Sequence, residues 1–183
     1  MGAAGSDGVP LCVDLDGTLV AADLLVLSLG RLVRRSPWAL LRLACLLPRS
    51  RALFKRRVFE AAPVDAAAVP YRASLVAWLS AERSSGRRLV LATASDAAPA
   101  AAVAGHLGLF DEVLASDGRT NLKGEAKRAR LVARFGERGF DYVGDSRADL
   151  PVFLSARRVA VAGGSASVRR AAERLGRLER TFS

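Results

Sequence analysis

The chain has 183 residues, of which 51% are hydrophobic and 25% are charged. This length favours one domain, with room for a small inserted subdomain, and this composition excludes an intrinsically disordered chain. Two cysteines and one histidine, with no CxxC motif, argue against a disulfide scaffold, a zinc cluster and a two-histidine iron site. The N-terminus has neither a basic start nor an apolar core, so we expect a cytoplasmic protein without a signal peptide.

The net charge of +10 comes almost entirely from one segment. No acidic residue lies between Asp23 and Glu60, whereas nine basic residues do. These are Arg31, Arg34, Arg35, Arg42, Arg49, Arg51, Lys55, Arg56 and Arg57. The remainder of the chain is therefore close to neutral, and the basic segment needs an explanation of its own.

Five short apolar runs predict strands that are buried on both faces, as in a parallel sheet. They cover residues 9–13, 88–93, 112–115, 140–145 and 158–162. Helical segments at residues 71–84, 97–107 and 124–135 alternate with them. This alternation predicts an α/β fold with a doubly wound parallel sheet, whose ligands bind beyond the carboxyl ends of the strands.

Residues 24–69 interrupt the alternation after the first strand. Asp23, Ser36 followed by Pro37, and Ser50 are each typical of a helix start, so we expect a small helical cap here. The α/β core would then comprise residues 8–23 and 70–183. The apolar run from Trp38 to Leu47 contains Arg42 and is shorter than the ~20 residues that span a bilayer.

Two aspartates, Asp14 and Asp16, follow the first predicted strand in the sequence DLDGT. Both carboxylates can face one site once the strand gives way to a loop, and Gly17 permits the turn and a close approach of the backbone. Such a pair suits a nucleophile together with a general acid and base. The alternative is a turn or calcium-loop motif, in which Asp-x-Asp-Gly is also common.

A second acidic group, Asp145 and Asp149, follows the predicted strand 140–145. In a parallel sheet this group lies at the same edge as Asp14. Clustered carboxylates repel one another, and a hard divalent cation such as Mg²⁺ relieves the repulsion. The sequence therefore predicts a magnesium site, although Asp145 or Ser146 could also serve as a helix N-cap alone.

An anion site is expected beside the carboxylates. Thr93 ends the second predicted strand, and backbone N–H groups around Ala94 precede a helix start. Lys123 precedes the helix that leads to Asp145, and a lysine there can neutralise phosphate charge. We assign phosphate binding to Thr93, Ala94, Lys123 and the backbone of Gly17. Taken singly, such a threonine is usually a cap and such a lysine is usually solvated.

The four motifs, in this order, resemble those of the haloacid dehalogenase superfamily of phosphohydrolases. They are DLDGT at 14–18, Thr93, the lysine of LKGEAK at 123, and GDSRAD at 144–149. The resemblance implies that Asp14 attacks phosphorus to form an aspartyl-phosphate. It also implies that Asp14, the backbone carbonyl of Asp16, and Asp145 hold Mg²⁺, with Asp149 supporting the metal shell.

The resemblance further implies catalytic roles for the remaining motif residues. Thr93 and Lys123 would hold the phosphoryl group, while Asp16 would protonate the leaving oxygen and then activate water. Dehalogenase members lack an acid at the position of Asp16, because a halide leaves without a proton. A phosphatase is therefore expected, with a helical cap that carries substrate specificity.

Residues from about Pro10 to Phe182 also resemble the phosphatase-like domain fused to UbiA-type prenyltransferases. The matching stretches are Phe54–Arg57, LVLATASD at 89–96, NLKGEAK at 121–127 and FDYVGDSRADLPVF at 140–153. This likeness implies a lipid-linked or prenyl-pathway phosphate as substrate, and a prenyltransferase as partner.

Two functions from different classes follow. The first is a Mg²⁺-dependent phosphatase acting on a small or lipid-linked phosphate. The second is a regulatory or docking domain whose basic cap binds an acidic membrane, at its inner face, or a prenyltransferase. The intact motifs favour the enzyme. Nucleic-acid binding is disfavoured because the basic segment has no recognisable nucleic-acid fold and is rich in apolar residues.

Overall fold

The computed structural model describes residues 8–45, 50–117 and 120–183. It confirms the expected α/β fold, in which six parallel strands form one sheet in the order β3-β2-β1-β4-β5-β6. The strands are β1 Leu11–Val13, β2 Leu89–Asp96, β3 Glu112–Ser116, β4 Asp141–Gly144, β5 Val159–Ala162 and β6 Leu178–Phe182. The central strand β1 pairs with β2 on one side and β4 on the other.

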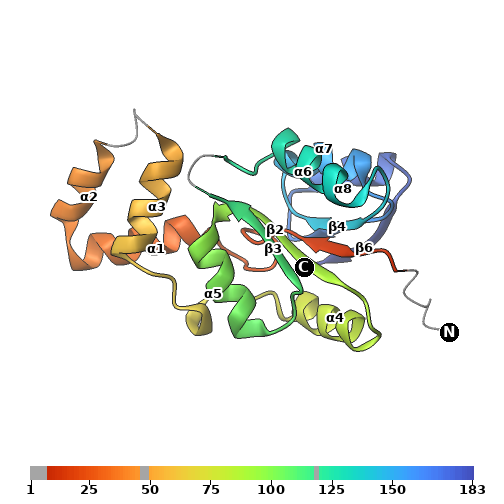
Figure 1. Ribbon diagram of the computed structural model, residues 1–183, viewed down its shortest axis with the longest axis horizontal. Coiled ribbons are helices and arrows are strands. Elements are labelled where there is room, and N and C mark those ends of the chain that lie inside the picture. The colour runs from red at the N-terminus through yellow and green to blue at the C-terminus, as the bar shows by residue number, and fades with distance from the viewer. Residues whose placement is uncertain (1–7, 46–49, 118–119) are drawn as a thin grey trace.

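Helices cover both faces of this sheet (Figure 1). On one face lie α4 (Ala73–Ser84) and α5 (Ala97–Leu107), and on the other lie α6 (Glu125–Phe135), α7 (Leu150–Ser155) and α8 (Ala166–Arg174). Successive strand residues alternate between the two apolar cores, so that Leu89 and Leu91 face one and Val90 the other. This arrangement explains why the strands read as continuous apolar runs.

The edge strand β6 was not among the predicted strands. Its sequence, Leu-Glu-Arg-Thr-Phe, has mostly exposed residues and buries only Phe182. Charged side chains are common on edge strands, where they discourage pairing with other chains. The apolar pattern that identifies the central strands is therefore missing at this edge.

Residues 24–69, which we call the cap segment, contain α1 (Leu24–Arg35), α2 (Pro37–Ala44), α3 (Arg51–Ala61) and a short 3₁₀ helix at Ala66–Ala68. The helix starts agree with the capping residues: Asp23 accepts hydrogen bonds from the backbone of α1, and Ser50 accepts one from Leu53. In Figure 1, α1, α2 and α3 form a separate lobe beside the sheet. Among the described residues, none of the helices combines the length and apolarity needed to cross a bilayer.

Candidate active site

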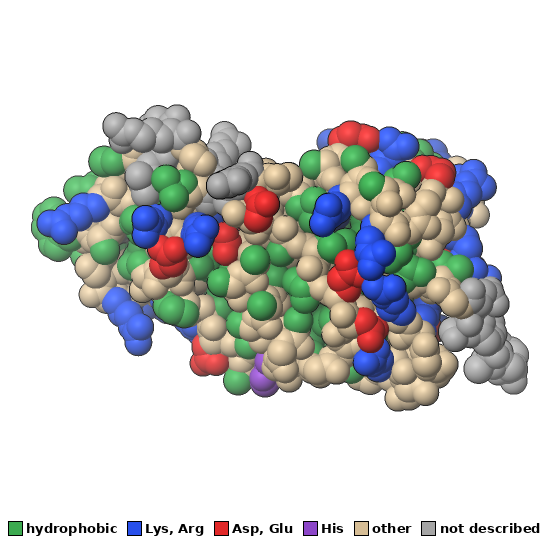
Figure 2. Space-filling model, in the orientation of Figure 1, with side chains coloured by type: hydrophobic (Ala, Val, Ile, Leu, Met, Phe, Trp, Pro, Cys, Tyr) green, Lys and Arg blue, Asp and Glu red, His purple; other side chains and the backbone are tan. Residues whose placement is uncertain are grey.

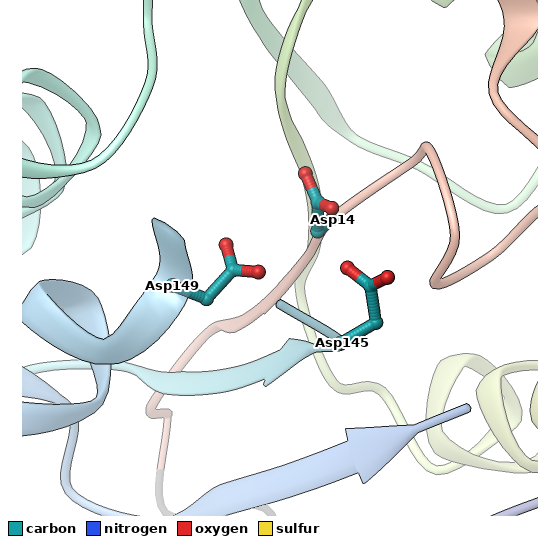
Figure 3. A group of neighbouring side chains, drawn as sticks. All are labelled: Asp14, Asp145 and Asp149. Atoms are coloured by element: carbon teal, nitrogen blue, oxygen red, sulfur yellow. The ribbon is translucent and has the colours of Figure 1, made fainter. Parts of the chain in front are cut away.

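Three carboxylates converge at the carboxyl edge of the sheet (Figure 3). Asp14 directly follows β1, Asp145 directly follows β4, and Asp149 ends the 3₁₀ turn Arg147–Asp149. Each offers an oxygen that lies within 4.8 Å of those of the other two. Parallel pairing of β1 with β4 brings the ends of these strands together, as the sequence predicted.

Asp14 is buried and lies between a cation and a hydroxyl group. Its Oδ1 accepts a hydrogen bond from Lys127 Nζ at 2.6 Å, and its Oδ2 accepts one from Thr18 Oγ1 at 3.3 Å. Burial raises the pKa of Asp14 above its usual value, and Asp149 adds to the effect, whereas Lys127 opposes it. The Lys127 contact thus orients the carboxyl group and offsets part of the effect of burial.

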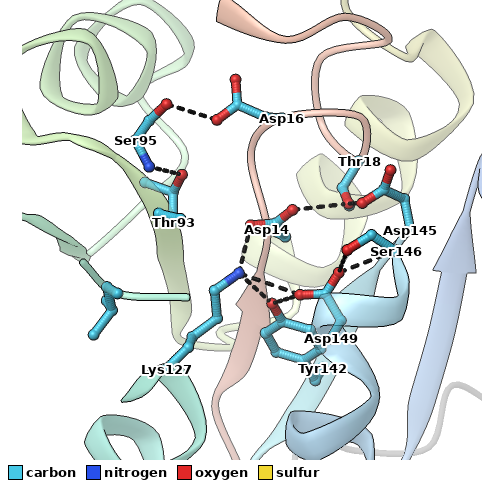
Figure 4. A network of polar contacts seen from close by, with 12 residues as sticks. Asp14, Asp16, Thr18, Thr93, Ser95, Lys127, Tyr142, Asp145, Ser146 and Asp149 are labelled. Atoms are coloured by element: carbon cyan, nitrogen blue, oxygen red, sulfur yellow. Dashed lines mark hydrogen bonds and ion pairs between the residues drawn. The ribbon is translucent and has the colours of Figure 1, made fainter. Parts of the chain in front are cut away.

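The lysine beside Asp14 is Lys127, not the Lys123 singled out in the sequence. Lys127 lies on α6 and is buried; its Nζ also donates to Tyr142 Oη at 2.9 Å and contacts Asp149 Oδ1 at 3.2 Å (Figure 4). Burial lowers the pKa of Lys127, but the two carboxylates outweigh it and raise the pKa overall. Lys123 lies one helical turn earlier, on an exposed loop at the rim of the same pocket.

The pattern of α6 contains a signal that identifies Lys127. The residue four positions later, Leu131, is fully buried, so Lys127 lies on the stripe of the helix that faces the core. A lysine in that stripe is buried only when it is paired. Its place at the N-terminal end of α6 puts its ammonium at the edge where Asp14 lies.

Asp149 has its acceptor positions occupied by the protein. Its Oδ1 accepts hydrogen bonds from Lys127 Nζ and Tyr142 Oη, and its Oδ2 accepts them from the backbone N–H and Oγ of Ser146. Burial acts to raise the pKa of Asp149, but Lys127, Tyr142 and Ser146 outweigh it and lower the pKa. Asp149 is therefore suited to fixing Lys127 and the turn that carries Asp145, rather than to direct coordination.

Asp145 packs against the loop that follows β1. Its Oδ1 accepts a hydrogen bond from Thr18 Oγ1, and its carboxylate lies where a Cβ on Gly17 would be. Gly17 has a φ of +80°, so both its backbone conformation and its missing side chain are needed here. Burial and the nearby Asp149 raise the pKa of Asp145 to about 6. Asp14 and Asp145, both destabilised as anions, are the carboxylates best placed to hold a cation.

Asp16 turns away from the three converging carboxylates and toward the end of β2 (Figure 4). Its Oδ1 accepts a hydrogen bond from the backbone of Leu24 at 2.8 Å, and its Oδ2 accepts one from Ser95 Oγ at 2.6 Å. Burial raises the pKa of Asp16. The buried Thr93 accepts a hydrogen bond from the backbone N–H of Ser95, so Thr93 and Ser95 together shape this side of the site.

Two further side chains were not recognised in the sequence. Arg72 donates to the carbonyl oxygens of Gly17 at 3.0 Å and Thr18 at 3.1 Å, and so holds the loop between Asp14 and α1. Lys55, on α3, donates to the carbonyl oxygen of Ala94 at 3.4 Å. Arg72 lies in no motif of the sequence, and Lys55 lies in the stretch Phe54–Arg57 but was not assigned to the site; both reach the loop or the site through tertiary packing.

The four aspartates described above, together with Lys55 and Lys127, line a pocket of about 220 Å³. Its wall comes from the core (Asp14, Asp16, Ala94, Lys127 and Asp145 among others) and from Leu25 and Lys55 of the cap segment. A larger hollow of about 530 Å³ lies elsewhere, against Arg31, Arg34 and Arg35. The smaller pocket is the candidate active site because it contains the convergent titratable groups.

Comparison with known proteins places this geometry in context. The model of the haloacid dehalogenase-like hydrolase family matches residues 11–154. Protein y4nM of Sinorhizobium fredii (strain NBRC 101917 / NGR234) is 37% identical over 155 residues, which cover 85% of this chain and 30% of that protein. The chain thus spans less than a third of this relative's length.

Two solved structures share the fold. A protein of unknown function from Bordetella pertussis Tohama I has a TM-score of 0.70 at 20% identity, covering 95% of this chain and 97% of that chain. A structure of the phospho-aspartyl intermediate analogue of phosphoserine phosphatase has a TM-score of 0.61 at 14% identity. The match covers 94% of this chain and 91% of that chain. At these identities the likeness shows a shared fold.

Proposed function

The chain belongs to the haloacid dehalogenase-like hydrolase family, and on this premise we propose that it is a Mg²⁺-dependent phosphomonoester phosphatase that acts through an aspartyl-phosphate on Asp14. The observation that carries the proposal is the contact of Asp14 with Lys127 on the wall of a pocket that also contains Asp145. A buried carboxylate held by an ammonium group, beside a second carboxylate, suits nucleophilic attack on an anionic phosphoryl group.

The metal site proposed for Mg²⁺ consists of Asp14, Asp145 and the backbone carbonyl of Asp16. Burial, together with the nearby Asp149, raises the pKa of Asp14 and Asp145, and this supports a divalent cation here, because such a cation would stabilise both carboxylates as anions. When bound, Mg²⁺ would neutralise charge on the phosphoryl oxygens. Asp149 would orient Lys127 and the turn that carries Asp145, through its contacts with Lys127 and Ser146.

The first chemical step forms a bond between an oxygen of Asp14 and phosphorus and breaks the bond from phosphorus to the ester oxygen. Asp16 gives a proton to that oxygen as it leaves, and burial shifts the pKa of Asp16 upward, in the direction that suits a general acid. Ser95 orients this carboxyl group through its hydrogen bond. We assign Thr93, the backbone of Gly17 and Ala94, and Lys127 to binding the phosphoryl oxygens. Lys123 lines the same pocket from its rim, whereas Lys127 is the lysine that contacts Asp14.

In the second step, water attacks phosphorus and Asp16 takes its proton. The bond between phosphorus and Asp14 breaks, so the carboxylate and inorganic phosphate are released. The separation of roles between Asp14 and Asp16 is supported by their different surroundings: Lys127 contacts the first, whereas a hydroxyl and a backbone N–H contact the second.

Phosphatase assays on the purified chain with Mg²⁺ test this proposal. Asp14→Asn should keep the fold and lose at least about three orders of magnitude in kcat, because removal of a nucleophile leaves only residual stabilisation. Excess EDTA should abolish turnover, and added Mg²⁺ should restore it. Undiminished turnover in Asp14→Asn, or in EDTA, would show that the assignment is wrong.

A second candidate function, docking to an anionic membrane or to a prenyltransferase, is favoured by the surface of the cap segment. Of the six large hydrophobic side chains that are exposed among the described residues, five belong to this segment: Val26, Val33, Trp38, Leu41 and Leu53. Figure 2 shows apolar and basic side chains interspersed over this lobe. Exposed apolar side chains beside cations suit an anionic bilayer, at the inner face of which a lipid-linked or prenyl-pathway phosphate would be the substrate.

Co-sedimentation with liposomes tests this docking function. We expect the protein to bind anionic vesicles at low salt and neutral vesicles much less, since each basic residue near such a surface contributes on the order of 1 kcal/mol. Replacing Arg34, Arg35 and Arg42 with Gln should remove the difference. Equal sedimentation with both kinds of vesicle would contradict membrane docking.

A further inference from the structure

Lys55 brings a positive charge from the cap segment into the active-site pocket. It lies on α3 between buried side chains, with Phe54 before it and Val58 and Phe59 on the following turn. These apolar contacts fix the helix, and Lys55 Nζ reaches the carbonyl oxygen of Ala94 at the end of β2. Lys55 therefore lines the same pocket as Asp14 and Asp16, although it is far from both in sequence.

Lys55 makes no ion pair with the described carboxylates, although its charge acts to lower the pKa of the nearby Asp16. The neighbours of Lys55 on α3, Arg56 and Arg57, both form ion pairs with Glu60. Lys127, at the inner wall, is held by Asp14 and Asp149. Within residues 8–45, 50–117 and 120–183, by contrast, the ion pairs include none made by Lys55.

Lys123 is a second cation of this kind on the core side of the pocket. It is exposed on the loop before α6, lines the same pocket and forms no ion pair with the described carboxylates. The remaining acid at the mouth, Asp23, already accepts hydrogen bonds from the backbone N–H groups of Leu25 and Val26. The pocket thus contains two ammonium groups, those of Lys55 and Lys123, without an ion-pair partner among the described residues, in addition to that of Lys127, which contacts Asp14.

We propose that Lys55 and Lys123 form a subsite for a second anionic group on the substrate, so that the preferred substrate is a compact phosphomonoester whose leaving group carries a carboxylate or another phosphate. This inference rests on the proposed phosphatase function and narrows it. The pocket volume of about 220 Å³ is smaller than that of sites that enclose drug-sized ligands, which supports a small substrate. A prenyl monophosphate, whose leaving group is uncharged, would leave both lysines without a partner.

The subsite also explains how the cap segment contributes to specificity. Lys55 contacts Ala94, next to Thr93 and Ser95, so a substrate held by Lys55 places its leaving group beside Asp16, which Ser95 orients. A hydrogen bond between charged groups in a partly desolvated site strengthens binding by about tenfold to a hundredfold. The second anion would thus both select the substrate and position its ester oxygen.

The test compares two small phosphomonoesters with the same two-carbon chain, phosphoglycolate, which carries a carboxylate, and ethyl phosphate, which does not. We expect the ratio of their kcat/KM values to favour phosphoglycolate in the wild-type protein and to fall about tenfold or more in Lys55→Met. Lys55→Arg should keep most of the ratio, because it keeps the charge. Arg56→Met, which removes an exposed neighbouring cation of α3, is the matched control and should leave the ratio unchanged.

A binding measurement separates this inference from the phosphatase proposal. Calorimetric titration with 3-phosphonopropionate and propylphosphonate, which cannot be hydrolysed at the carbon–phosphorus bond, reports the subsite even if no ester is turned over. Tighter binding of 3-phosphonopropionate that depends on Lys55 supports the subsite. Equal affinity for the two phosphonates, or an equal kcat/KM ratio in wild type and Lys55→Met, would overturn it. Failure of the wild type to hydrolyse any ester would instead refute the phosphatase function.

Discussion

Replacing Lys127 with Met tests whether this buried lysine, and not Lys123, holds the nucleophile. Lys127 Nζ lies 2.6 Å from Asp14 Oδ1 and 3.2 Å from Asp149 Oδ1. At an effective dielectric constant of ~20, these separations correspond to gross attractions of about 6 and about 5 kcal/mol. Desolvation offsets most of that attraction, and removal of one partner of a buried ion pair typically costs about 3–5 kcal/mol.

The expected consequence is a large loss of rate. If about 3–4 kcal/mol of stabilisation is lost in the transition state, kcat falls by about two to three orders of magnitude. Steady-state assays with an activated aryl phosphate measure this loss, and circular dichroism checks that the variant is folded. Lys127→Arg keeps the charge and should lose less.

Lys123→Met is the matched comparison, because it removes the same group from an exposed position four residues earlier. We expect its loss of kcat on the same substrate to be at least about tenfold smaller than that of Lys127→Met. A larger loss in Lys123→Met than in Lys127→Met, with both variants folded, would refute the reasoning.

Three further predictions concern Asp16 and Gly17, in the loop that follows β1, and Asp141, at the amino end of β4. Asp16→Asn should reduce hydrolysis of alkyl phosphates more than of activated aryl phosphates, which need less acid catalysis; equal losses would exclude the acid role. Gly17→Ala should lose most activity, because its Cβ would overlap the carboxylate of Asp145 and its φ of +80° disfavours alanine; wild-type kinetics would contradict this. Asp141→Ala should lower the free energy of urea unfolding by about 3–5 kcal/mol, because it removes the buried partner of Arg87; a loss below about 1 kcal/mol would be unexpected.

The central part of the fold could be predicted because parallel strands carry a strong local pattern. The run before Asp14 is apolar at every position, as is expected of a strand that is covered on both faces. The edge strand Leu178–Phe182 could not be found in this way, since it is mostly exposed and its charged residues suit an edge.

The carboxylates of the site were also predictable, because their placement follows from the strand ends. Asp14 and Asp145 come directly after paired strands, so topology alone brings them together. The choice between Lys123 and Lys127 depends on which side of α6 faces the core, and a motif that contains both lysines does not decide it. Lys55 reaches the pocket only through packing of α3 against the end of β2, which no local pattern encodes.

Asp141 and Asp145, at opposite ends of β4, have different surroundings. Asp141, at its amino end, is buried and accepts hydrogen bonds from Arg87, Arg157 and the backbone of Arg158, so its charge stabilises the fold. Asp145, beyond its carboxyl end, has no cation in ion-pair contact among the described residues and faces the pocket. The same residue type therefore serves structure at one edge and the candidate chemistry at the other.

Chemical trapping of the phosphorylated enzyme tests the central claim most directly. Asp16→Asn should slow attack by water on the intermediate, so that the aspartyl-phosphate accumulates when this variant is mixed with Mg²⁺ and an aryl phosphate. Borohydride reduction followed by peptide mass spectrometry should then reveal homoserine at position 14, dependent on substrate and absent from position 16. Turnover of the aryl phosphate by this variant without any conversion of Asp14, or conversion at another residue, would contradict the account.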